Sequence, residues 1–223
     1  MNVKPENQLS NISIHIGIIH ATNISMDIWP ENLRRELDLE INTVQDGLDK
    51  QRETFRQASR EMLRNGSYKP TGRAKPSSEY LLREATRGNF PSINPVVDIN
   101  NLISLRHMVP ISLWDTDRAG SGHVVFRLGK VGESFVFNET GQQIDLTDLI
   151  TGFAVAGDHQ SPMINPVKDA MATKTAADTR NVAAAVYYPI DAGSHNHLQQ
   201  LLDDFAALLG QLGPQAETET VII

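Results

Sequence analysis

The chain contains no cysteine, which excludes disulfide frameworks, thiolate zinc sites and cysteine nucleophiles. This absence fits a reducing compartment, and we expect a cytoplasmic protein. Long hydrophobic runs are also missing, because no stretch approaches the length of a membrane span. The opening residues MNVKPENQLS lack the basic start and apolar core of a signal peptide. We therefore expect no membrane partner.

Common catalytic and nucleotide-binding motifs are absent as well. The sequence has no Walker-type phosphate loop, no G-x-G-x-x-G, no H-E-x-x-H and no G-x-S-x-G. The pair His195 and His197 could offer two imidazoles to a metal, but no third ligand stands at convincing spacing, and a surface pair at a helix start is the favoured interpretation. The sequence predicts no cofactor and no resident metal.

The charge balance is acidic, with 20 Lys and Arg against 27 Asp and Glu and a net charge of -7. A broad electrostatic footprint for nucleic acid is therefore not expected, and DNA is not a predicted partner. One local basic cluster stands out, in SYKPTGRAKPSSEYLLREATRG. It is either a solvated loop and helix face or a contact for RNA or phosphate. Its cations are Lys69, Arg73, Lys75, Arg83 and Arg87.

The order of elements predicts a single α+β domain over residues 1–223, with residues 1–10 as a flexible N-terminal lead-in. A buried strand is expected over 11–21, and Pro30 suits the first turn of one or two helices that end near Gly66. Ser77 is placed to cap a further helix that ends at Gly88. Short β segments follow from residue 107, and then an amphipathic helix and an edge strand close the chain.

The segment 95–106 is predicted to be helical, and polar residues interrupt its apolar stripe. Asn94, Asp98 and Asn101 follow i, i+4, i+7 spacing, and Asn100 lies beside them. Polar side chains on a mostly buried helix must find partners or cost free energy. The cluster is therefore either a satisfied structural network or a site.

The run KPSSEYLLREATRGNFPSINPVVDINNLISLRHMVPISLWDTDRAGSGHVVFRLGKVGESF resembles the B3/B4 domain of the phenylalanyl-tRNA synthetase β subunit and, still more, its free-standing relatives. The matching features are the S-S-E helix start, INPVVDINNLISL, Pro110, the WDTDR turn, HVVFR, and GES in place of the usual G-E. A weaker match continues through TKTAADTRNVAAAV. The resemblance covers roughly residues 50–190.

This resemblance implies a mixed β-sheet core, partly barrel-like, flanked by helices. In the synthetase this domain is an editing site, which hydrolyses the ester of a tRNA wrongly charged with tyrosine and holds the terminal adenosine and the amino acid in one cleft. Asn100 and Asn101 fall on the pair that follows the family's V-D, and Pro110 falls on the proline of the opposite loop. Such hydrolysis needs a positioned water and hydrogen-bond donors, which amides and backbone groups can supply.

We therefore expect one cleft built from residues scattered over the middle of the chain, and RNA contacts from nearby cations. The expected cleft residues are Asn94, Asp98, Asn100, Asn101, Pro110, Ser112, Gly157 and Asp158, and the expected RNA contacts are Arg73, Lys75, Arg127 and Lys168. For Asp98 a structural role, capping a neighbouring backbone turn, is favoured. For Arg127 a surface ion pair is favoured.

Two departures from the family pattern bear on activity. Ser112 stands where the synthetase has a histidine, and Ala185 stands where it has the glutamate that meets the tyrosine hydroxyl. Losing a carboxylate that binds a phenol hydroxyl removes much of the preference for tyrosine. No catalytic residue is assigned, and hydrolysis by this chain is left open.

Three hypotheses follow. The first is a free-standing homologue of the editing domain that binds the 3′ end of tRNA and hydrolyses mischarged aminoacyl-tRNA. The second is a non-catalytic binder of a free amino acid or another small metabolite in the same cleft. The third is an interaction domain with a vestigial cleft. The oligomeric state and the amino-acid specificity are not specified by these patterns.

Overall fold

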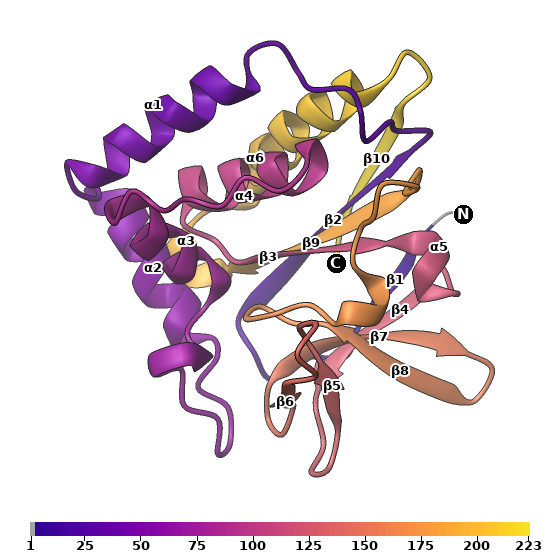
Figure 1. Ribbon diagram of the computed structural model, residues 1–223. Helices are drawn as coiled ribbons and strands as arrows, with labels where there is room; N and C mark the ends of the chain where they lie inside the picture. Colours follow the sequence, from indigo (N-terminus) through magenta and orange to yellow (C-terminus); the bar gives the residue numbers. More distant parts are fainter. Residues whose placement is uncertain (1–2) are drawn as a thin grey trace.

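The computed structural model describes residues 3–223, and Figure 1 shows the longer helices gathered on one side and most strands, with the short helix α5, on the other. The helices are α1 (Leu33–Gln45), α2 (Lys50–Glu61), α3 (Ser77–Thr86), α4 (Pro95–His107), α5 (Thr116–Ala119) and α6 (His195–Leu209). The strands are β1 (Lys4–Asn7), β2 (Ile14–Thr22), β3 (Ile111–Asp115), β4 (His123–Leu128), β5 (Ser134–Val136), β6 (Gln143–Asp145), β7 (Ile150–Ala156), β8 (His159–Ile164), β9 (Val182–Pro189) and β10 (Glu217–Ile222). Short 3₁₀ turns include η1 (Gly72–Ala74) and η2 (Met171–Thr173).

The strands form two four-stranded sheets and one hairpin. The first sheet has the order β1-β4-β7-β8, in which β1 runs parallel to β4, and the second is antiparallel with the order β10-β2-β9-β3. The strands β5 and β6 form the hairpin. The predicted α+β class with helices against a mixed β core is confirmed, and the sheets of the described residues stay open rather than closing into a barrel.

The second sheet lies between two hydrophobic cores, because side chains of a strand alternate between its faces. In β9, Ala184, Val186 and Tyr188 face the helices. Its intervening residues, Ala183, Ala185 and Tyr187, pack with the first sheet. Apolar side chains on both faces explain why this strand reads as a continuous hydrophobic run.

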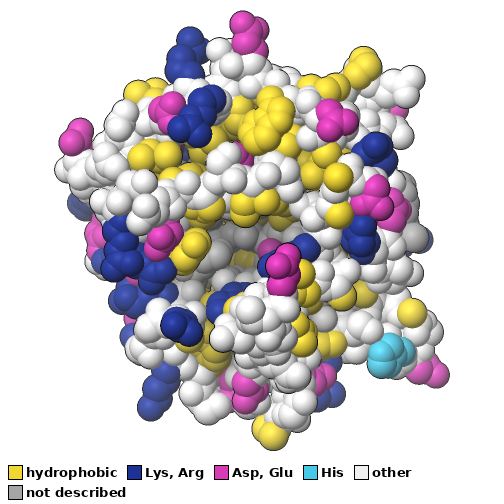
Figure 2. All heavy atoms as spheres, in the orientation of Figure 1, with side chains coloured by type: hydrophobic (Ala, Val, Ile, Leu, Met, Phe, Trp, Pro, Cys, Tyr) yellow, Lys and Arg dark blue, Asp and Glu magenta, His cyan; other side chains and the backbone are white. Residues whose placement is uncertain are grey.

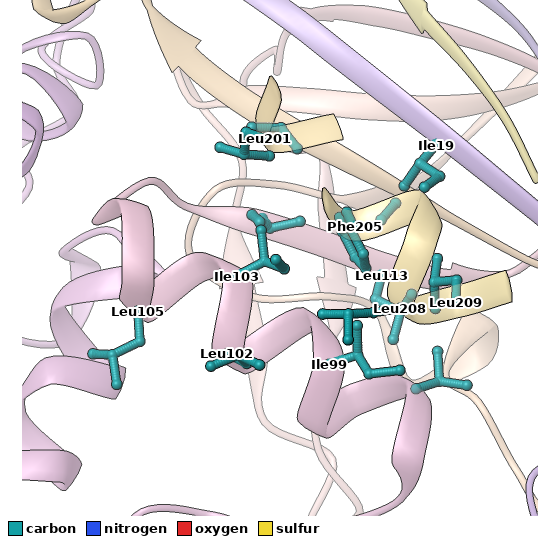
Figure 3. Close-up of a cluster of buried hydrophobic side chains, with 14 of the residues drawn as sticks. Ile19, Ile99, Leu102, Ile103, Leu105, Leu113, Leu201, Phe205, Leu208 and Leu209 are labelled. Atoms are coloured by element: carbon teal, nitrogen blue, oxygen red, sulfur yellow. The ribbon is translucent and has the colours of Figure 1, made fainter. Parts of the chain in front are cut away.

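Helices α4 and α6 supply much of the helical side of the core. Figure 3 shows their side chains meeting those of the second sheet, with Ile99 and Ile103 from α4, Phe205 from α6 and Leu113 from β3. Ten of the thirteen residues of α4 are buried, so the helix has no broad solvent face. Its polar residues must therefore be explained by partners or by a cavity.

Several local predictions need correction. The expected flexible lead-in is wrong over Lys4–Asn7, because these residues form β1 and pair with His123–Phe126 of β4. Met1 and Asn2 lie outside the described residues. Pro30 precedes the first helix rather than starting it, and its carbonyl accepts a hydrogen bond from the Leu33 N–H.

The helical stretch up to Gly66 divides into α1 and α2, with Gly47 between them in a left-handed conformation at φ 116°. Ser77 does not cap α3 with its hydroxyl. The cap position is Pro76, and the Ser77 N–H donates to the Pro166 carbonyl. Within residues 3–223, no helix has the length and apolar character needed to cross a membrane. The cytoplasmic location stays a prediction.

Candidate ligand-binding cleft

A cleft of about 1260 Å³ opens between the helical side and the strand side of the molecule. Its walls come from α3, α4, β3, the loop over residues 165–175 and the turn that follows β5. Figure 2 shows this face hollowed near its centre, with dark blue Lys and Arg side chains beside the hollow. The cleft is larger than most pockets for drug-sized ligands, which span roughly 300–1000 Å³.

Helix α4 presents two amides to the cleft. Asn100 and Asn101 both line it and are 7% and 8% exposed. The Asn100 Oδ1 is buried and has no hydrogen-bond partner among residues 3–223. An unpaired buried acceptor costs free energy unless another group satisfies it. Both amides therefore line the cleft, and their contact with a ligand stays a prediction.

The start of α4 sets the position of these amides. Asn94 caps the helix by accepting a hydrogen bond from the Val97 N–H at 2.9 Å, and Pro95 occupies the first turn. The Asn94 Nδ2 donates to the Thr175 Oγ1 at 3.2 Å. Asn94 thus lines the cleft as predicted, and it also ties α4 to the loop on the opposite wall.

Asp98 has a structural role and does not line the cleft. Its Oδ1 accepts from the Ile93 N–H at 2.8 Å, and its Oδ2 accepts from the Ser92 hydroxyl at 2.6 Å. The carboxylate therefore holds the turn that leads into α4. The favoured interpretation from sequence agrees with this geometry, and the placement of Asp98 among the cleft residues is corrected.

The loop after β8 contributes two cleft residues that the sequence analysis missed. Asn165 accepts hydrogen bonds from the N–H groups of Val167 and Lys168 through Oδ1, while its Nδ2 is buried without a partner in the described part of the chain. Asp169 accepts from the Leu113 N–H at 3.2 Å, so it covers the free edge of β3. The dipeptide Asn165–Pro166 directly after a strand is a turn signal that could have drawn attention to this loop.

The carboxyl group of Asp169 is electrostatically unusual. The residue as a whole is partly exposed, whereas its Oδ1 is buried and has no partner within the described residues. Burial raises the pKa of Asp169 to about 7, and the hydrogen bond from the Leu113 N–H opposes part of that rise. At neutral pH this wall of the cleft therefore carries only part of a negative charge.

Cations surround the cleft. Six Lys and Arg side chains line it, compared with two acids, Glu79 and Asp169. The carboxylate of Glu79 is paired with Arg60 and Arg56 on α2, so it contributes little net charge to the opening. The six cations are Arg73, Lys75, Arg83, Arg87, Lys168 and Lys174. The predicted contacts Arg73, Lys75 and Lys168 are therefore brought together.

Ser112 and Pro110 are placed away from the cleft. In β3 the residues Ile111 and Leu113 line the cleft, so the alternation of the strand turns Ser112 to the opposite face. There its hydroxyl donates to the Asn165 carbonyl at 2.9 Å and lies 3.2 Å from the Tyr187 hydroxyl. The Pro110 carbonyl accepts from the Tyr187 N–H.

The positions that the resemblance assigns to the family's histidine and glutamate are directly opposed in the sheet. Ser112 pairs with Ala185 across β3 and β9, and both side chains are fully buried. Ala185 packs in the core between the two sheets. Neither residue therefore lines this cleft.

The remaining predicted residues also lie elsewhere. Gly157 and Asp158 form the exposed turn between β7 and β8 and are not part of the cleft. Arg127 is held by Glu133, with Nη2 to Oε1 at 2.7 Å, and its guanidinium stacks 3.6 Å from the centroid of the Phe153 ring. The favoured interpretation of Arg127 as an ion-pair residue agrees with this, and its expected RNA contact is not supported by its position.

The predicted pair of histidines at the start of α6 divides, because His195 is exposed whereas His197 belongs to a packing cluster. The His197 Nδ1 lies 2.8 Å from the Tyr188 hydroxyl, and its Nε2 lies 3.3 Å from the His107 Nδ1. Burial, followed by the nearby His197, lowers the pKa of His107 to about 3. Among residues 3–223 no group of three or more His, Asp or Glu side chains is arranged to hold a metal ion.

The cleft therefore combines neutral hydrogen-bonding groups at its walls with a cationic opening. Its amides can donate to and accept from hydroxyl and carbonyl groups, and its cations can neutralise an anion. No histidine is among the described residues that line it. The arrangement suits binding of a polar, anionic ligand.

Comparison with known proteins finds a matching family and two similar proteins. The B3/4 domain family model matches residues 68–199, which is more than half of the chain. The phenylalanine–tRNA ligase β subunit of Staphylococcus saprophyticus is 28% identical over 88 residues, covering 37% of this chain and 11% of that protein. An N-terminal fragment of the phenylalanyl-tRNA synthetase β subunit from Pyrococcus horikoshii superposes with a TM-score of 0.52 at 10% identity, covering all of this chain and 54% of the fragment. The chain thus spans a small part of the curated relative.

Proposed function

The chain belongs to the B3/4 domain family, and from this membership and the cleft we propose that it binds the 3′ end of an aminoacylated tRNA and hydrolyses the ester of a wrongly attached amino acid. Fold and family alone do not establish an activity. The relatives named above are tRNA ligase subunits, and the chain covers only a small share of the curated one. The argument therefore rests on the cleft itself.

The observation that carries the proposal is the charge of the cleft. Six cations line one cavity of a chain whose net charge is -7. A cationic patch on an acidic protein attracts a compact anion, and it does not create the broad basic surface that duplex nucleic acid requires. The single-stranded end of a tRNA is such a compact anion.

An aromatic side chain stands among these cations. Tyr80 on α3 lines the cleft and is 49% exposed, and the guanidinium of Arg83 lies 5.1 Å from its ring centroid. Bases of single-stranded nucleic acids stack on exposed aromatic rings next to basic groups. Tyr80 is therefore our choice for the platform under the terminal base.

The ester would then meet the amides of α4. Asn100 and Asn101 can bind ribose hydroxyls and stabilise the oxyanion that forms when water attacks the ester carbonyl. Because no histidine lines the cleft, the hydrolysis we propose depends on positioning and hydrogen bonding. Because Ala185 is buried in another core, nothing at that position would select a tyrosine hydroxyl. We therefore propose an ester other than tyrosyl as the substrate.

The test is binding and deacylation of a panel of aminoacyl-tRNAs at low salt by the wild type and Asn100→Ala. We expect turnover of at least one ester and a loss of roughly tenfold or more in the variant, since it removes a hydrogen-bonding group from the cleft. The melting temperature should change little. Asn11→Ala, at an exposed asparagine outside the cleft, is the matched control.

A second candidate is a non-catalytic binder of a free amino acid or small metabolite. The absence of a lining histidine among the described residues favours it. If no ester is cleaved at enzyme concentrations near those of the tRNA, hydrolysis is rejected. Calorimetric titration with free amino acids then tests the binder, and weak binding of uncharged tRNA with tight binding of an amino acid would select it.

A further inference from the structure

Two lysines on separate turns of the cleft loop converge on one aromatic residue. The Nζ of Lys168 lies 3.5 Å from the centroid of the Phe137 ring, and the Nζ of Lys174 donates a hydrogen bond to the Phe137 carbonyl at 2.8 Å. Arg73, from the η1 turn, lies close enough to contribute electrostatically. Burial lowers the pKa of Lys168, and the positive charges of Arg73 and Lys174 lower it further.

The basic triad consists of Arg73, Lys168 and Lys174, which all line the cleft. None of its members forms an ion pair among the described residues. Of the two acids that line the cleft, Glu79 is paired with arginines of α2, and Asp169 is a buried carboxyl that holds the Leu113 N–H. Lys174 interacts electrostatically with the partly ionised carboxyl of Asp169, which offsets only part of the positive charge of the triad. Three cations held near one another repel each other, and a bound anion relieves that repulsion.

The triad also lies next to the start of α4. Thr175 follows Lys174 directly and accepts the hydrogen bond from the Asn94 Nδ2. From Asn94 to Asn100 the helix advances about 9 Å at 1.5 Å per residue. One nucleotide with an ester on its ribose is long enough to span such a distance. The cleft therefore has a cationic end and an amide end.

We propose that the basic triad is a phosphate-binding subsite that takes the 5′-phosphate of the terminal nucleotide, so that the ribose and its ester point toward Asn100 and Asn101. This inference rests on the proposed function and adds the orientation of the ligand. A phosphate offers several charged acceptor oxygens, which suit two ammonium groups and one guanidinium. In this arrangement Lys168 and Lys174 bind the phosphate from the loop, and Arg73 binds it from the η1 turn.

The test is calorimetric titration of the full chain at low salt with adenosine and with adenosine 5′-monophosphate, which differ only in the phosphate. Wild type should bind the monophosphate roughly tenfold or more tightly than adenosine. Lys168→Ala and Lys174→Ala should each reduce this preference severalfold and leave the affinity for adenosine unchanged. Lys130→Ala, at an exposed lysine outside the cleft, should keep the full preference.

The outcomes separate this inference from the proposed function. Equal binding of the two ligands by wild type, together with binding of tRNA, overturns the phosphate subsite alone. No binding of either ligand or of tRNA overturns both. If inorganic phosphate binds as tightly as the monophosphate, the nucleoside adds nothing to the affinity. That result overturns the proposed orientation of the ribose and its ester toward Asn100 and Asn101. Because the comparison of the two ligands needs only the wild type, a misfolded variant does not decide the result.

Discussion

Neighbouring polar residues of α4 differ in role because they meet different surroundings. The carboxylate of Asp98 accepts hydrogen bonds from two donors in the turn before the helix, so it stabilises local structure. Asn100 and Asn101, two and three residues later, reach the cleft, and the Asn100 Oδ1 finds no partner there. One turn of a helix can thus carry a structural acid and an amide that lines a cleft.

Asp169 makes stability depend on pH in a defined direction. Burial raises its pKa from 3.8 to about 7 in the folded protein, so the folded state binds the proton more tightly than the unfolded state does. Its stabilising contribution is complete below about pH 4 and is lost as the pH rises through about 7. An amide in place of this carboxyl cannot ionise, so Asp169→Asn should match wild type at low pH and exceed its stability at high pH.

The expected difference in the free energy of unfolding is up to about 4 kcal/mol, because each pKa unit corresponds to about 1.4 kcal/mol. Urea denaturation of both proteins from pH 4 to pH 8 measures it. Asp158→Asn, at the exposed β7–β8 turn, serves as the control and should show no such trend. A constant difference between Asp169→Asn and wild type across this range would contradict the prediction.

At the scale of the element, α4 depends on its cap. Asn94→Ala removes the acceptor for the Val97 N–H and the donor to Thr175, and we expect it to cost about 1 kcal/mol of stability. Thermal unfolding measures this loss. Asn94→Ser keeps a capping oxygen and lacks the amide donor, so it should recover most of the stability.

Ligand binding distinguishes the two roles of Asn94. If the link to Thr175 orients the loop, Asn94→Ser should bind tRNA more weakly than wild type despite its restored stability. Unchanged stability of Asn94→Ala would mean that the cap contributes little, and full binding by Asn94→Ser would mean that the link to Thr175 does not shape the cleft.

At the scale of the whole molecule, the charge of the cleft is opposite in sign to the net charge of the chain. The chain is acidic overall, yet its cleft is lined by six cations. Binding of tRNA should therefore weaken with salt, with a slope of log K against log salt that reflects only a few phosphates. Lys168→Ala should reduce the size of that slope by about 0.7, the value for one contact to a single strand.

Filter binding over a series of salt concentrations gives this slope. Lys130→Ala should leave it unchanged, because this lysine lies outside the cleft. Affinity that does not vary with salt would show that phosphate contacts do not drive the association, and it would favour the small-molecule binder.

The sequence by itself determined the α+β class, the helix over 95–106, the family and three cleft residues, Asn94, Asn100 and Asn101. These features follow from local patterns. Helical spacing predicts which residues share a face. The long motif around the helix then identified its relatives.

Only the tertiary structure decided which face of β3 borders the cleft, and it turned Ser112 away because Ile111 and Leu113 face the helices. It also brought Arg73 together with Lys168 and Lys174, which lie about a hundred residues later in the chain. Likewise, β1 forms because β4 offers it a free edge. The physical reason is common to these cases. Local spacing fixes where side chains lie relative to one another on an element, whereas packing between distant segments decides what each face meets.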